Sequence, residues 1–211
     1  MPEPGRSGAA VAIITLVAVA GPPLGLSAAW ITVGVLTALV AISVDAAAFA
    51  GMGGHVLAES LPGGVARLRR IAIHEAGHGL MAEAEALPVG DVLVGSLACL
   101  RAGRRSLGST ALEPPAQARL PVTDLRRWSR VLQAGMVAEE LIYGEARGGS
   151  DDRMLLGRLW GLSGYDAATA QMEQRQARRE VLQRLRQQRD QLEARAENLL
   201  ATAPRLGRRP A

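Results

Sequence analysis

The stretch HEAGH at residues 74–78 lies inside a longer segment, residues 67–87, that is rich in strong helix formers. Pro88 and Gly90 end this segment. Within it, one set of residues recurs at spacings of three and four, as one face of an α-helix requires: Leu68, Ile71, His74, His78 and Met81. The segment therefore predicts a helix that carries both histidines on the same face.

Two histidines one helical turn apart can bind the same tetrahedral zinc ion, and the H-E-x-x-H pattern is typical of zinc metallopeptidases. Glu75 follows His74 directly, so it lies beside the metal and can act as general base toward a zinc-bound water, whose pKa falls toward about 7. The chain has three histidines, and two of them fall in this motif. The sequence therefore predicts Zn²⁺ held by His74 and His78, with Glu75 as the catalytic base.

A catalytic zinc ion takes three protein ligands and leaves one position for water. Cys99 is the single cysteine and no further histidine lies near the motif, so the third ligand is expected to be a carboxylate. Spacing alone does not choose among the candidates, since a buried glutamate could instead hydrogen-bond a ligand imidazole and an aspartate could cap a helix. The candidates form two downstream pairs: Glu139 with Glu140, and Asp151 with Asp152.

The amino-terminal part is apolar, with no charged residue from Ser7 to Val44. Residues 8–26 and 27–44 are expected to form two transmembrane helices joined by a short turn. In the alternative interpretation, residues 11–19 are the core of a signal peptide with a cleavage site at residues 18–20. Three arginines follow the second span, which predicts a multi-pass membrane protein whose carboxy-terminal domain is cytoplasmic: Arg67, Arg69 and Arg70.

All 24 basic residues are arginines, so this chain has no lysine for a phosphate-binding P-loop. Residues 172–200 are rich in Arg, Gln and Glu and follow a rough heptad that Arg189 interrupts. One long amphipathic helix is expected there, packed on the domain or paired with another copy. Its acidic residues are interspersed with the arginines, so we expect no nucleic-acid partner, whereas anionic membrane lipid is a compatible one.

Four motifs, in this order, make residues 67–160 resemble the FtsH family of membrane-bound zinc proteases: IHEAGHG (73–79), SLGST (106–110), AEELIYGE (138–145) and GGSDD (148–152). The resemblance implies that Asp152 is the third zinc ligand and that Glu139 lies just outside the metal's ligands. It also implies a mainly α, zincin-type peptidase domain with a small β element. The strands expected at residues 92–94 and 107–112 would offer an edge to an extended substrate, with Ser109 and Thr110 along it.

The chain also departs from that family, which places an ATPase domain between the anchor and the peptidase. Here the expected organisation is an anchor at residues 1–50, a linker at 51–66 and a peptidase domain at 67–205. The family's Asn-Asp pair reads Asp151-Asp152, so Asp151 stays an alternative ligand.

These features predict a membrane-anchored zinc endopeptidase that cuts unfolded or membrane-associated proteins without an ATPase of its own. Its expected partners are protein or peptide substrates and membrane lipid, and a homo-oligomer or a separate ATPase is compatible with the sequence. The alternative is a non-catalytic membrane adaptor, or a peptidase subunit that works with a separate ATPase.

Overall fold

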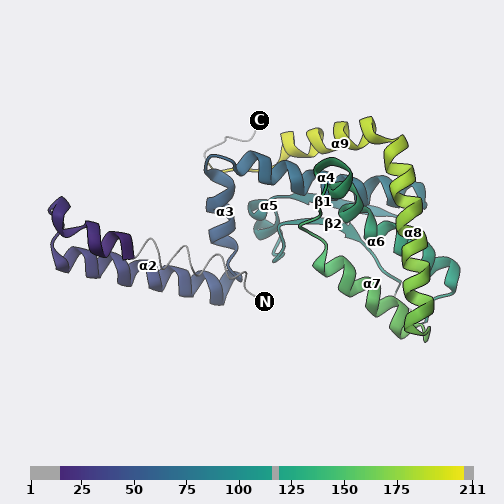
Figure 1. The fold of residues 1–211 in the computed structure, drawn as a ribbon, viewed down its shortest axis with the longest axis horizontal. Helices are drawn as coiled ribbons and strands as arrows, with labels where there is room; N and C mark the ends of the chain where they lie inside the picture. Colours follow the sequence, from purple (N-terminus) through teal and green to yellow (C-terminus); the bar gives the residue numbers. More distant parts are fainter. Residues whose placement is uncertain (1–14, 116–118, 207–211) are drawn as a thin grey trace. The chain divides into compact units, whose positions relative to one another are not determined.

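The computed structural model describes residues 15–115 and 119–206. These residues are mainly α-helical and contain one small sheet, as the sequence predicts (Figure 1). The chain divides into two compact units, Met1–Gly54 and His55–Ala211.

The first unit contains the apolar segments. Residues 15–20 are helical, a 3₁₀ turn follows at η1 (Pro22–Leu24), and α2 covers Ala28–Phe49. Among the described residues, α2 is the one helix long and apolar enough to cross a membrane, and none of its residues is buried. A signal sequence near an N-terminus shares this length and composition. The second predicted span is therefore a helix, whereas much of the first falls on residues 1–14, outside the described part of the chain.

The end of α2 is tied to the start of α3 (Met52–Ser60) by one carboxylate. The backbone N–H groups of Gly53 and Gly54 donate to the two oxygens of Asp45, at 2.7 and 3.0 Å. The first amides of a helix have no partner within the helix, so a carboxylate placed there satisfies them. Asp45, the first charged residue after the apolar run, thus accepts two hydrogen bonds from the backbone.

The second unit is a helical domain with a two-stranded sheet among its described residues. The structure corrects the expected linker at residues 51–66, because most of that segment is helix α3, and the domain begins at His55. The reason is that Val56 and Glu59 are buried, which a solvated linker would not achieve. Its further elements are α4 (Gly64–Ala84), β1 (Val89–Val94), α5 (Ser96–Arg101), β2 (Gly108–Leu112), α6 (Val122–Tyr143), α7 (Ser150–Leu162), α8 (Ala167–Gln187) and α9 (Arg189–Thr202).

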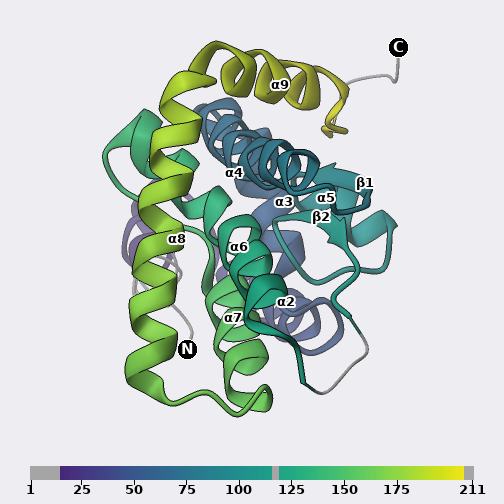
Figure 2. The ribbon, with the colours of Figure 1, turned by 90° about the vertical axis from the view of Figure 1, so that its right-hand side faces the viewer.

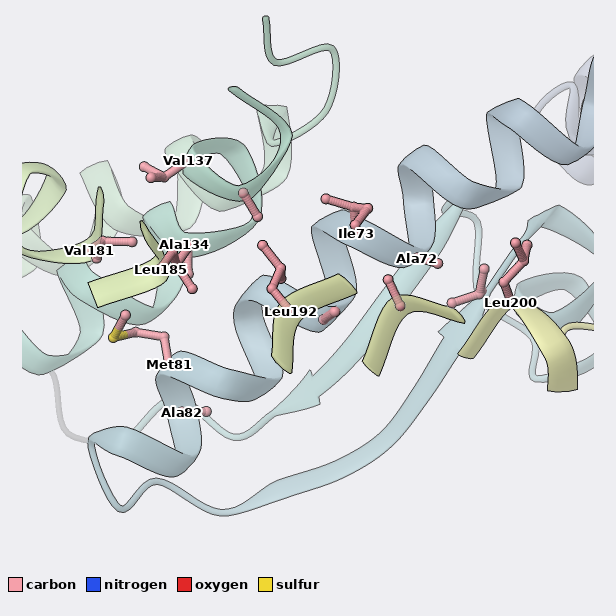
Figure 3. Close-up of a cluster of buried hydrophobic side chains, with 14 of the residues drawn as sticks. Ala72, Ile73, Met81, Ala82, Ala134, Val137, Val181, Leu185, Leu192 and Leu200 are labelled. Carbon is pink, nitrogen blue, oxygen red and sulfur yellow. The ribbon is translucent and has the colours of Figure 1, made fainter. Parts of the chain in front are cut away.

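Helix α4 is the helix predicted around the HEAGH motif, and it forms the centre of the domain. It packs against α6 and α9, while α8 packs on α6 (Figure 2). Every residue from Ala72 to Gly79 is buried. Figure 3 shows the apolar side chains that fill the space between these helices, among them Ile73, Val137 and Leu192. Full burial of such a side chain contributes about 1.5–3 kcal/mol, so the motif is held in a rigid part of the fold.

The carboxy-terminal segment differs from the single long helix that was expected. The backbone leaves the helical conformation at Gln188 (φ −108°, ψ 25°), and α8 and α9 run in different directions (Figure 2). Leu185 before the break and Leu192 after it are both fully buried. A straight helix would carry Leu192 and the residues after it past the domain, whereas the bend returns them to α4. The break lies next to Arg189, where the heptad pattern is interrupted.

The small β element is present, and it is an antiparallel pair. Val92 pairs with Thr110, Leu93 with Ser109 and Val94 with Gly108. The connection between the strands contains the short helix α5. The pairing places Gly108 and Thr110 next to α4.

Candidate metal centre

Helix α4 presents His74 and His78 toward α6, and both side chains are buried, with 8% and 3% of their surface exposed. The two helices approach closely at Gly77. A Cβ there would stand 2.7 Å from the Ala134 carbonyl oxygen and 2.8 Å from the Ala138 Cβ. Glycine at this position therefore lets the histidine face of α4 lie directly on α6.

The structure separates the candidate carboxylates. Asp152, in the first turn of α7, brings its Oδ2 to 3.2 Å from His74 Nε2 and 3.4 Å from His78 Nε2. Asp151 is exposed, and Glu140 forms an ion pair with Arg178 on α8. Of the two downstream pairs, only Asp152 therefore joins the histidines as a member of a three-residue group that could hold a metal ion.

The three candidate ligand atoms have the spacing of a zinc site. His74 Nε2 and His78 Nε2 are 3.1 Å apart, and Asp152 Oδ2 completes a triangle with sides of 3.2 and 3.4 Å. Around a tetrahedral zinc ion with bonds of about 2.0–2.1 Å, ligand atoms stand about 3.3–3.4 Å apart. The residues therefore fit a zinc ion with two imidazoles and one carboxylate, which leaves a fourth position open.

Hydrogen bonds at the far side of each imidazole select the tautomer that a metal needs. His74 Nδ1 donates to Glu139 Oε1 at 2.7 Å, and His78 Nδ1 donates to the Val131 carbonyl oxygen at 2.8 Å. Both partners are acceptors, so in each neutral ring the proton is on Nδ1 and the lone pair is on Nε2. Two lone pairs and a carboxylate facing one another repel unless a cation lies between them.

Hydrogen bonds between His74, His78 and the carboxylates also shift the pKa values of His74 and Asp152. Burial by itself lowers the pKa of His74, but its hydrogen bonds to the carboxylates of Asp152 and Glu139 outweigh burial and raise it to about 10. For Asp152, burial acts to raise the pKa, but hydrogen bonds to His74 and His78 outweigh it and hold the pKa well below its usual range. When no metal is bound, a proton on His74 thus supplies the positive charge that balances the carboxylates of Asp152 and Glu139.

Glu139 is buried in α6 with donors around both oxygens. Its Oε1 accepts from His74 and from the Gly148 N–H, and its Oε2 accepts from Arg70 Nη1 and the Arg147 N–H, both at 3.0 Å. Burial acts to raise its pKa, but these hydrogen bonds, with His74 first, lower it overall. Glu139 therefore stays ionised and fixes the His74 ring without reaching the ligand triangle.

Glu75 projects from α4 toward the sheet. The Thr110 hydroxyl of β2 donates to Glu75 Oε2 at 2.7 Å. A Cβ at Gly108 would come within 2.5 Å of Glu75 Oε1, so the glycine leaves room for the second oxygen. Burial raises the pKa of Glu75, which makes the carboxylate a stronger base than an exposed glutamate.

Gly135 in α6 is a site residue that the sequence analysis did not single out. A Cβ there would stand 2.4 Å from His74 Nε2 and 2.6 Å from His78 Nε2. The available signal was a glycine one turn before Glu139 in an apolar helix, where glycine costs about 1 kcal/mol relative to alanine and needs a reason. The Thr110 contact with Glu75 was also missed, because it joins residues 35 positions apart.

No protein-family model matches the chain, and no curated protein matches it at a significant level.

Proposed function

We propose that this protein is an FtsH-like zinc metalloendopeptidase, anchored in the membrane by its apolar amino-terminal part. The observation that supports this best is the convergence of His74, His78 and Asp152 with Glu75 beside them. A structural zinc site would normally be closed by four ligands, whereas this donor set supplies three and leaves a position for water. The FtsH-like motifs found in the sequence occupy the same site.

The chemistry divides between the metal and the chain. A bound zinc ion would supply a water acidic enough to lose a proton near neutral pH and would polarise the substrate carbonyl. His74, His78 and Asp152 would hold it, and Glu139 would keep the His74 ring in place. Fixed ligand orientation of this kind preserves metal affinity and activity.

Glu75 is the group that moves protons in this proposal. Thr110 fixes its Oε2, which leaves Oε1 to take a proton from the attacking water. Its raised pKa keeps that proton long enough for Glu75 to pass it to the leaving amine. A buried carboxylate of this kind can act first as base and then as acid.

The sheet offers a place for the substrate. Each strand has a single strand partner among the described residues, so β2 keeps one edge without a strand. Thr110 on β2 contacts the catalytic glutamate, and an extended peptide that added to this edge would run beside Glu75. Because backbone hydrogen bonds hold such a peptide, unfolded segments of proteins are the substrates that we propose.

The test is cleavage of an unfolded protein by the full chain in detergent, with zinc and without ATP. The wild type should cleave, a chelator should stop cleavage, and Glu75→Gln should bind zinc without cleaving. Glu83→Gln is the matched control, because Glu83 is an exposed residue of the same helix, paired with Arg195, and should leave activity unchanged. Equal activity of Glu75→Gln and the wild type would refute the proposal.

The second candidate is a peptidase subunit that depends on a separate ATPase or a non-catalytic adaptor. The burial of the site favours a partner, since only 5% of the Glu75 surface and 3% of the His78 surface are exposed. A partner that delivers an extended segment would solve this problem of access. Bound zinc without cleavage by the isolated chain would favour this candidate over the first.

A further inference from the structure

We propose that the corner between α3 and α4 rests in the lipid headgroup layer and holds the peptidase domain against the membrane. This corner is defined by Leu57, Leu61, Val65 and Arg67. The inference rests on the proposal that α2 anchors the chain, and it concerns a surface that the metal centre does not use.

The corner is an apolar surface within the second unit. Leu57, Leu61 and Val65 are 62%, 64% and 51% exposed. Leu57 lies on α3, and Leu61 directly follows Ser60, the last residue of that helix. Val65 follows in the first turn of α4.

The opposite face of α3 is fixed inside the domain. Glu59 is 7% exposed, and its carboxylate accepts hydrogen bonds from the Ser96 backbone N–H at 3.0 Å and from the Ser96 hydroxyl at 2.6 Å. Val56 is buried on the same side. These contacts fix one face of α3 against the domain, while Leu57 stays exposed to solvent.

The turn into α4 is equally constrained. A Cβ at Gly64 would stand 2.0 Å from the Glu59 carbonyl oxygen, and Gly63 has a φ of +90°, which favours glycine. The corner is therefore a fixed shape rather than a flexible loop.

The charge of the corner suits a lipid surface. Glu59 is the only acidic residue between Asp45 and Glu75, and it is turned inward. Leu57, Leu61 and Val65 are exposed and aliphatic, and Arg67, two residues after Val65, is also exposed. Apolar side chains with a neighbouring arginine are the composition with which interfacial helices bind anionic bilayers.

The length of the chain keeps the corner near the span. Leu57 follows Phe49, the last residue of α2, by eight positions, and five of these steps lie within α3. Three extended steps and five helical ones span at most about 18 Å. The headgroup region begins where the apolar span ends, so Leu57 is within reach of it.

A second copy of the chain suits this surface less well. A stable interface buries about 800 Å² on each partner, which three aliphatic side chains do not provide. A bilayer needs no matching shape, and the short connection keeps Leu57 within reach of it when α2 is inserted.

The experiment places an environment-sensitive fluorophore on the full chain in vesicles of phosphatidylcholine and phosphatidylglycerol. Leu57→Cys and Leu61→Cys receive the probe, and the native Cys99 is fully buried, so the unsubstituted protein serves as the labelling blank. Met172→Cys on α8 is the matched control, because Met172 is an apolar residue with 55% exposure. The readouts are emission shift and quenching by lipids that carry a spin label.

We expect blue-shifted emission and lipid quenching at residues 57 and 61, and neither at residue 172. Water-like emission at residues 57 and 61, in a chain that resists carbonate extraction, would overturn the docked corner and leave the anchor intact. A blue shift without lipid quenching would also overturn it, because another protein would then cover the corner. Extraction by carbonate would show that α2 does not anchor the chain, while zinc content measured on the same sample reports the metal centre separately.

Discussion

Replacement of Gly135 by alanine tests the metal centre with a single methyl group. That methyl would stand 2.4 Å from His74 Nε2 and 2.6 Å from His78 Nε2, which is close to a metal–nitrogen distance from both atoms. An ordinary carbon–nitrogen contact is about 3.5 Å, so both rings would have to move by roughly 1 Å. Zinc–ligand distances tolerate deviations of about 0.2 Å, and a shift of this size would remove two of the three ligands.

The expected effects on metal and fold have different sizes. Loss of an outer partner of a ligand costs about 10–100-fold in metal affinity, so displacement of two ligands should cost at least about 100-fold. The fold should survive, because alanine in place of glycine inside a helix favours the helix by about 0.5–1 kcal/mol, against about 1–3 kcal/mol for overpacking. The free energy of unfolding of the metal-free variant should therefore fall by no more than about 2.5 kcal/mol.

The assay is zinc binding by competition with a chromophoric chelator, together with thermal unfolding of the metal-free protein. Gly157→Ala is the matched control, because a Cβ at this position in α7 meets nothing within 4 Å. The control should bind zinc normally and gain about 0.5–1 kcal/mol in stability. Wild-type zinc affinity in Gly135→Ala would refute the placement of the metal between the two histidines.

Three further predictions concern the groups around the metal. Glu139→Gln should weaken zinc binding by about 10–100-fold, whereas Glu140→Gln should leave it unchanged, and equal affinities in a chelator competition would contradict the role of Glu139. Thr110→Val should lower kcat with little effect on zinc content, because Glu75 loses the hydroxyl that holds it. Thr110→Ser should restore kcat, because serine supplies that hydroxyl again. A serine variant as slow as the valine variant would argue against the role of Thr110 in positioning Glu75. The pKa of His74 is raised to about 10, so the stability that its proton contributes to the metal-free chain is complete below about pH 6.5 and is lost as the pH rises toward 10. Zinc must displace that proton, so calorimetry near pH 7 in buffers of different ionisation enthalpy should show proton release, and its absence would count against a charged His74.

Local patterns in the sequence were sufficient for the helix of the HEAGH motif, because the three- and four-residue spacing around His74 involves residues close in the chain. The mainly helical class and the strand pair were expected from the resemblance to the FtsH family, and both are present. The helix α5 between the two strands was not expected.

Other features depended on burial, which a linear pattern does not report. The segment at residues 51–66 looked like a linker because it is rich in small residues, yet Glu59 is buried against Ser96 and makes α3 part of the domain. The break at Gln188 follows from the return of Leu192 to α4, and only the interrupted heptad at Arg189 hinted at it.

The candidate site shows the same division between local pattern and spatial placement. The H-E-x-x-H spacing could be read directly, whereas the choice between Asp151 and Asp152 required their orientation in the first turn of α7. Residue type and spacing left both aspartates possible. In the structure one of them reaches the imidazoles and the other faces solvent.

Three glycines determine the geometry of the site as much as the metal-binding side chains do. Gly77 lets α4 lie on α6, Gly135 keeps the space between the two imidazoles open, and Gly108 leaves room for one oxygen of Glu75. Each of these glycines weakens its own helix or strand, so local propensity opposes all three. Alanine at Gly135 would favour the helix itself by about 0.5–1 kcal/mol, but its methyl group would fill the space where the three ligand atoms meet. The glycine at this position therefore gives up helix stability and keeps the metal site open.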